Sequence, residues 1–169
     1  MLVCASCGNK SNMKENIVGN PSKIEIKNAK GFNVRNGGNG IRLVDVKDPQ
    51  KGNSRSYHFA LVPHGNNSKT PDGYTRIEVP IKRTILMTML QLSNFTALNA
   101  HDVVKGITGT KNLFNKDILE RVKRGDIVKI GVEGNFDTEL VLAANADVIF
   151  ISPFKRGGYD AIKESGVPL

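Results

Sequence analysis

The stretch from 119 to 152 changes its hydrophobic period at Gly125, and this change constrains the fold more than any other feature of the chain. Apolar residues before the glycine repeat at helical spacing, and those after it alternate as in a strand. Asn115 suits the N-cap of the helix, and Gly125 suits the left-handed residue that ends it. The sequence therefore predicts a helix over 115–122 that leads into a hairpin of strands 127–133 and 138–152.

Upstream of the helix, alternating apolar and polar residues predict further strands, and the glycine-rich turn 36–40 suits a hairpin between two of them. The ranges are 23–27, 31–35, 41–46, 55–62 and 74–81. The segment 84–95 fits a strand or a helix, and 99–107 fits a short helix. We expect a mostly β protein, built as an OB-like barrel with one or two short helices; a β-sandwich or jelly roll is the alternative.

The chain of 169 residues is long enough for one ordinary domain with a core. Residues 1–22 are polar and rich in asparagine, which is typical of an extension. Residues 23–152 hold the predicted strands and form the expected β-barrel domain. Residues 153–169 are expected to form a mobile C-terminal tail.

The sequence contains no apolar run of about 18 residues, the length that a membrane-spanning helix requires. The segment 1–8 lacks both the charged region and the long apolar region of a secretory signal. We therefore expect a cytoplasmic protein without a membrane partner.

Cys4 and Cys7 have the spacing of half a zinc knuckle, in which two thiolates on one turn bind a single tetrahedral ion. A second cysteine pair is missing from the sequence, so His58, His64 or His101 would have to complete such a site. A redox dithiol, an inert pair and a metal shared between subunits are the alternatives. No other cofactor is expected.

The region around the predicted helix resembles bacterial single-stranded DNA-binding proteins, which have an OB-fold. In that family a helix ends in a basic residue and a glycine and leads into an alternating strand, as residues 119–134 do here. A Thr-Glu-aliphatic strand then follows, as at 138–143, and 149–151 matches the closing strand. The resemblance covers about a third of the chain and implies single-strand binding. The acidic C-terminal tail of that family is missing here.

The net charge of +8 favours an anionic partner such as nucleic acid. Tyrosines on or beside the predicted strands alternate with arginines, a combination that stacks on bases and attracts phosphates without sequence preference. Core packing is the competing explanation for the aromatic residues. The candidate nucleic-acid-binding residues are Arg35, Arg55, Tyr57, Tyr74, Arg76, Lys82, Lys155 and Arg156.

The sequence gives little support to catalysis, because no nucleophile lies in a known motif and the acidic residues are scattered singly. We expect a protein that is not an enzyme and that forms a homo-oligomer. The alternative function is a structural coat or assembly subunit, for example of a virion, whose terminal extensions are exchanged with neighbours.

Overall fold

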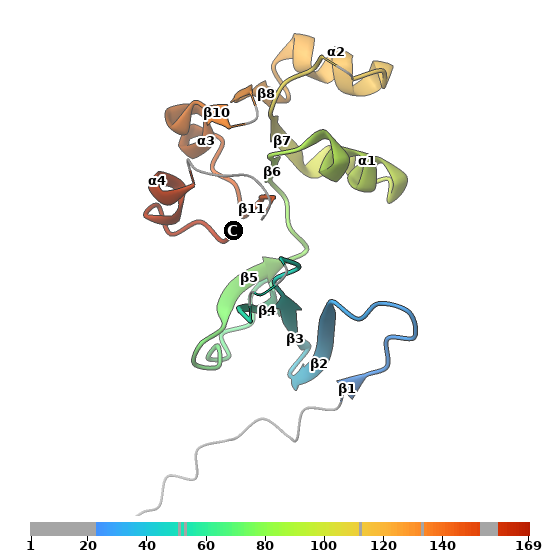
Figure 1. Cartoon of the computed structure of the whole chain (residues 1–169). Coiled ribbons are helices and arrows are strands. Elements are labelled where there is room, and N and C mark those ends of the chain that lie inside the picture. Colours follow the sequence, from blue (N-terminus) through green and yellow to red (C-terminus); the bar gives the residue numbers. More distant parts are fainter. Residues whose placement is uncertain (1–22, 51, 53, 112, 133, 153–158) are drawn as a thin grey trace, which may run out of the picture.

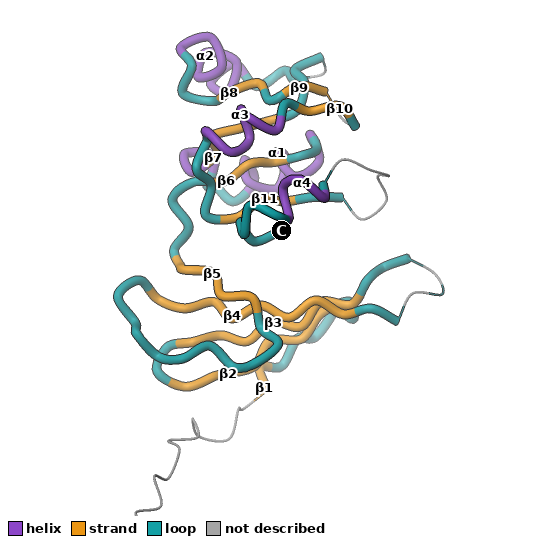
Figure 2. The backbone as a smooth tube through the Cα atoms, turned by 90° about the vertical axis from the view of Figure 1, so that its left-hand side faces the viewer, coloured by secondary structure: helices purple, strands orange, loops and turns teal. Residues whose placement is uncertain are grey.

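The computed structural model describes residues 23–50, 52, 54–111, 113–132, 134–152 and 159–169. These residues form two lobes joined by one crossing of the chain, as Figures 1 and 2 show. The β lobe spans 23–79 and the α/β lobe spans 84–169. More of the described residues lie in strands than in helices, so the expectation of a mostly β protein is confirmed.

The β lobe is a single five-stranded sheet in the order β1-β2-β3-β4-β5. Neighbouring strands are antiparallel except β4 and β5, which are parallel. The strands are β1 (Lys23–Ile24), β2 (Phe32–Gly38), β3 (Ile41–Lys47), β4 (Ser56–Pro63) and β5 (Thr75–Val79). The hairpin predicted at 36–40 is present, and Asn39 at its tip has a positive φ.

The two faces of this sheet differ. On one face Ile41, Leu43, Ala60 and Val62 are buried together, with Tyr74 packed against them. Alternation and strand register place a second apolar set on the other face, which we call the open face. Its members are Ile24, Phe32, Val34, Val44, Val46, Tyr57, Phe59, Leu61, Ile77 and Val79. Ile77 is buried, and the other nine are exposed or half-buried.

The α/β lobe contains a four-stranded parallel sheet in the order β11-β6-β7-β8. Its strands are β6 (Thr84–Leu86), β7 (Val104–Ile107), β8 (Val128–Lys129) and β11 (Val148–Phe150), and β9 (Gly131–Val132) pairs with β10 (Asn135–Phe136) in a small hairpin. Its helices are α1 (Met89–Ala97), the 3₁₀ helix η1 (His101–Val103), α2 (Lys116–Arg124), α3 (Thr138–Ala143) and α4 (Asp160–Lys163).

Buried side chains lie on both faces of the parallel sheet. On one face Leu86 and Ile107 pack with Leu92 of α1 and Ile118 of α2. On the other face Ile85, from the same strand as Leu86, packs with residues of α3 and α4. The helices therefore cover both sides, which is the usual arrangement of a parallel sheet.

The predicted helix after Asn115 is confirmed. The Asn115 side chain accepts a hydrogen bond from the backbone of Ile118, and Gly125 is left-handed with φ of 82°. The strand predicted over 138–152 is present only as β11, and its first half is wrong. Residues 138–143 form α3, because Asp137 caps them and leucine, glutamate and alanine favour a helix.

Two other segments differ from their sequence-based descriptions. The ambiguous segment 84–95 contains both predicted elements in succession, β6 and then α1. The helix expected over 99–107 is only one 3₁₀ turn, and β-branched Val104 and Ile107 continue as β7.

The closed OB-like barrel is not found, because the β-lobe sheet ends at β1 and β5 without pairing between them in the described residues. The helix α2 leads into a parallel strand, β8, instead of a barrel hairpin. In the segment expected to be a tail, Ile162 is fully buried and packs with Ile85 and Ile149. Residues 1–22 and 153–158 lie outside the described residues.

The crossing between the lobes is tied to the start of β11. The carboxylate of Asp147 accepts hydrogen bonds from the backbone amides of Lys82 and Arg83, at 2.6 and 3.0 Å. The Arg83 guanidinium in turn donates to the carbonyl oxygens of Ala144 and Asn145, which lie at the end of α3. These bonds hold the linker against the amino edge of the parallel sheet.

Candidate functional site

The order of strands in the α/β lobe reverses at one point of the sheet. The chain starts at β6, moves through β7 to β8, and then returns to lay β11 on the other side of β6. All four strands are parallel, so their carboxyl ends lie at the same edge. Open α/β sheets bind ligands at this edge, where the strand order reverses. Here the reversal lies between β6 and β11.

The turn from β6 into α1 is fixed at this reversal. Thr88 and Gln91 form a capping box, in which the Gln91 amide donates to the threonine hydroxyl and the Gln91 side chain accepts from the Thr88 amide. Gln91 Nε2 also donates to the carbonyl oxygen of Ile151, directly after β11, at 3.0 Å. The start of α1 and the end of β11 are therefore held together.

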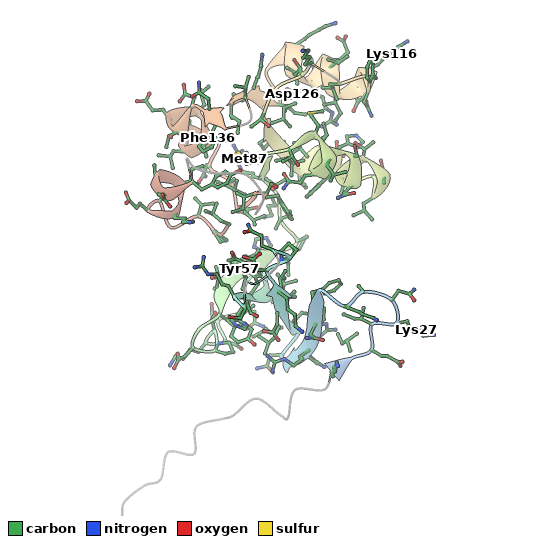
Figure 3. All side chains as sticks on the ribbon, viewed as in Figure 1. Lys27, Tyr57, Met87, Lys116, Asp126 and Phe136 are labelled. Atoms are coloured by element: carbon green, nitrogen blue, oxygen red, sulfur yellow. The ribbon has the colours of Figure 1, made fainter. Side chains whose placement is uncertain are left out.

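The neighbouring strand end is tied to the same turn. The hydroxyl of buried Thr108, after β7, donates to the carbonyl oxygen of Met87 at 2.9 Å, and the Met87 amide donates to Phe150 of β11. Figure 3 shows Met87 within the α/β lobe. The ends of three strands thus form a rigid edge.

A cavity of about 430 Å³ lies between α1 and the segment that enters α2. Its lining contains no charged side chain. The lining residues are Met89, Leu92, Ser93, Thr96, Ala97, Leu113, Phe114 and Asn115. Phe114 is 86% exposed at its rim, whereas Leu113 is buried in the core below. The arrangement suits an uncharged ligand with apolar surface.

Two of the predicted nucleic-acid-binding residues meet in a polar cluster on the β lobe. Arg35 forms an ion pair with Asp45 at 3.0 Å and also donates to the Tyr74 hydroxyl. The Tyr74 hydroxyl donates to Asp45 at 2.8 Å, and Nδ1 of His58 lies 2.7 Å from the same carboxylate. The side chains of Arg35 and Tyr74 therefore both bind the carboxylate of Asp45 within the β lobe.

Burial raises the pKa of Asp45, but hydrogen bonds from His58, Tyr74 and Arg35 outweigh this effect, and the pKa lies below its usual value. The pKa of Tyr74 is raised by burial and by its hydrogen bond to Asp45. Both shifts favour the pairing of an ionised carboxylate with a neutral phenol. The cluster is thus a structural joint between three strands and the segment entering β5.

The remaining described candidates lie apart from this cluster. Arg76 donates to the carbonyl oxygens of Asn66 and Ser68, and Tyr57, labelled in Figure 3, lies on the open face. Arg55 directly precedes β4, and Lys82 lies in the linker. The candidates are thus divided between two sheet faces and the linker. Lys155 and Arg156 lie outside the described residues.

Cys4 and Cys7 also lie outside the described residues. Within the part of the chain that the structure describes, no cluster of three or more histidine, cysteine, aspartate or glutamate residues could hold a metal ion. No helix among the described residues is long and apolar enough to cross a membrane.

No protein-family model matches the chain. An uncharacterized lipoprotein of Methanocaldococcus jannaschii is 31% identical over 108 residues, which cover 60% of this chain. The chain spans a quarter of the length of this curated relative. The similarity therefore concerns one part of a longer protein.

Sequence reasoning missed the carboxyl-edge site. The available signal was Thr88-Met89-Leu90-Gln91, a capping box that marks a helix start directly after the apolar run 85–87. Nothing in the sequence indicated that β11 would return beside β6, because that pairing joins residues 64 positions apart.

Proposed function

We propose that this chain is part of a lipid-anchored protein that binds a small uncharged molecule at the carboxyl edge of its α/β lobe. The observation that carries the proposal is the open cavity between α1 and the segment that enters α2. Both helices begin at the carboxyl edge of the parallel sheet, the edge at which such sheets bind ligands.

The cavity has the size and chemistry of a small-molecule site. Its volume of about 430 Å³ falls within the range of ligand pockets. The hydroxyls of Ser93 and Thr96 donate to the carbonyl oxygens of Met89 and Leu92, so their oxygens keep acceptor capacity toward the cavity. Phe114 offers an exposed ring on which a flat ligand can stack.

A pair of adjacent substitutions tests the site. Ser93 lines the cavity, and neighbouring Asn94 is equally exposed but is outside the lining. After dialysis against the low-molecular-mass fraction of a native cell extract, native mass spectrometry should find a retained compound on the wild type and on Asn94→Trp. Ser93→Trp should lose it. Retention by both variants, or by no form of the chain, would refute the site.

The lipid anchor is supported by the name of the relative and by the sequence around Cys7. Two small residues, Ala5 and Ser6, directly precede this cysteine. Fifteen residues separate Cys7 from the start of β1. This proposal replaces the zinc role of Cys7 with a thioether to a diacylglycerol group.

Mass analysis of the N-terminal peptide from native cells tests the anchor. We expect Cys7 to be the first residue and to carry the lipid mass, and the protein to partition into detergent. An unmodified Cys7 in the soluble fraction would restore the cytoplasmic expectation. Zinc bound in stoichiometric amount would restore the metal site.

Single-stranded nucleic-acid binding by the β lobe is the second candidate. Between residues 23 and 79 the sequence has ten lysines and arginines against five acidic residues, and Arg55 adjoins the strand that carries Tyr57. Fluorescence anisotropy with a labelled oligonucleotide should show an affinity that falls steeply with salt. Tyr57→Ala should weaken it by about 1–3 kcal/mol. An unchanged affinity would exclude Tyr57.

A coat or assembly subunit remains a prediction. Light scattering tests it, because such a subunit should form large closed particles.

A further inference from the structure

We infer that the open face of the β-lobe sheet is an interface between two copies of this chain, packed face to face. Ile24, Phe32 and Tyr57 on this face are 39%, 37% and 39% exposed. All the described helices lie in the other lobe, so none covers the sheet (Figures 1 and 2). The inference does not depend on the ligand site.

The β lobe has too small a core to leave this face uncovered. Its buried hydrophobic cluster consists of four residues, Ile41, Leu43, Ala60 and Val62. The clusters of the α/β lobe contain eight and seven buried residues. A single sheet needs apolar cover on at least one face, and here the larger apolar set is on the side that no described helix or second sheet covers. A second layer would complete a β-sandwich.

The dimensions of the face fit a second copy. Five strands about 4.8 Å apart, with a length of about 25 Å for the longer ones, give a face on the order of 500 Å². Two copies would thus bury about 1,000 Å² in total, the lower limit for a specific interface. Sheets that pack in this way lie about 10 Å apart, and the side chains of the two inner faces interdigitate.

The charges also fit a pair of copies. The middle of the face, formed by Val34, Val44, Val46 and Phe59, carries no charge. Arg42 and Arg55 lie at opposite ends of the strands, where they stay at the rim of a face-to-face pair. An apolar centre with a polar rim is the anatomy of a homodimer interface. A nucleic acid would find few cations beside the rings, and its affinity depends on phosphate contacts.

Sedimentation equilibrium of the whole chain tests this inference. At submillimolar concentration we expect twice the mass of the 18.4-kDa chain, with dissociation at low micromolar concentration. Phe32→Ser and Tyr57→Ser should each weaken the dimer by roughly tenfold to a hundredfold, as for aromatic residues buried in an interface. Leu98→Ser is the matched control, because Leu98 is 78% exposed on the other lobe and should leave the dimer unchanged.

A dye measurement on the wild type does not depend on folding of the variants. Fluorescence of anilinonaphthalene sulfonate per chain should fall as dimers form, since the apolar face becomes covered. A monomer at every concentration would overturn the inference, as would equal weakening by Leu98→Ser. A monomer that binds anionic phospholipid vesicles or a single-stranded oligonucleotide through Tyr57 would overturn it in favour of that partner.

Discussion

Replacing Gly106 by alanine tests the packing of β6 against β7. A Cβ atom at Gly106 would lie 3.0 Å from Cγ1 of Ile85 and 3.3 Å from Cγ2 of Ile130, and both isoleucines are fully buried. Overpacking of this kind costs about 1–3 kcal/mol. Alanine also reduces the conformational freedom of the unfolded chain, which raises the unfolding free energy by about 0.4–1 kcal/mol. We therefore expect a net loss of about 1–2 kcal/mol in unfolding free energy.

The double variant gives the sharper test. Ile85→Ala alone should cost about 2–5 kcal/mol, because it leaves a cavity. In that background the methyl group of Gly106→Ala fills part of the cavity, so the second substitution should become neutral or stabilising.

Urea unfolding followed by circular dichroism measures all four proteins, and Ile85→Val serves as the milder background if Ile85→Ala does not fold. In the OB-like arrangement expected from the sequence these two residues need not touch. Additive losses in the double variant would therefore refute the parallel pairing of β6 and β7.

Two other substitutions test polar contacts. Asp45→Asn should lower the urea midpoint at neutral pH, because the lowered pKa of Asp45 gives stability that is present above the unfolded value and is lost as pH falls through the folded value. The difference from wild type should shrink as the pH is lowered through that range, and exposed Asp72→Asn should leave the midpoint at neutral pH unchanged. Asp147→Ala should lower the unfolding free energy by about 1–3 kcal/mol, because it removes the acceptor of two linker amides. Asp160→Ala is the control, since its side chain is 90% exposed and its loss should cost little. Equal shifts of the melting temperature for the two variants would contradict this role of Asp147.

Elements specified by nearby residues could be predicted. The strands of the β lobe follow from alternation, and α2 follows from Asn115 and Gly125 at its ends. The helix α3 could also have been predicted, because Asp137 precedes a run of good helix formers. It was missed because Thr138-Glu139-Leu140 was matched to a strand of single-stranded DNA-binding proteins.

The parallel sheet could not be predicted in the same way. Its strands are only two to four residues long, which is too short for a period to identify their partners. Their pairing depends on crossover helices that bring distant residues together, as with Thr84 and Val148. The cavity follows from that pairing, and so it too was beyond local patterns. The roles of Arg35 and Tyr74 could not be predicted either. The sequence suggested that they bind nucleic acid, whereas in the structure both contact the carboxylate of Asp45.

The linker has a mechanical consequence for the two lobes. Its residues Lys82 and Arg83 are held by Asp147, and β5 ends at Val79. Only Pro80 and Ile81 are left to bend, and the ring of proline fixes its φ. The linker therefore has few backbone angles that can change. Reorientation of one lobe against the other would require the two hydrogen bonds from the linker amides to the Asp147 carboxylate to break.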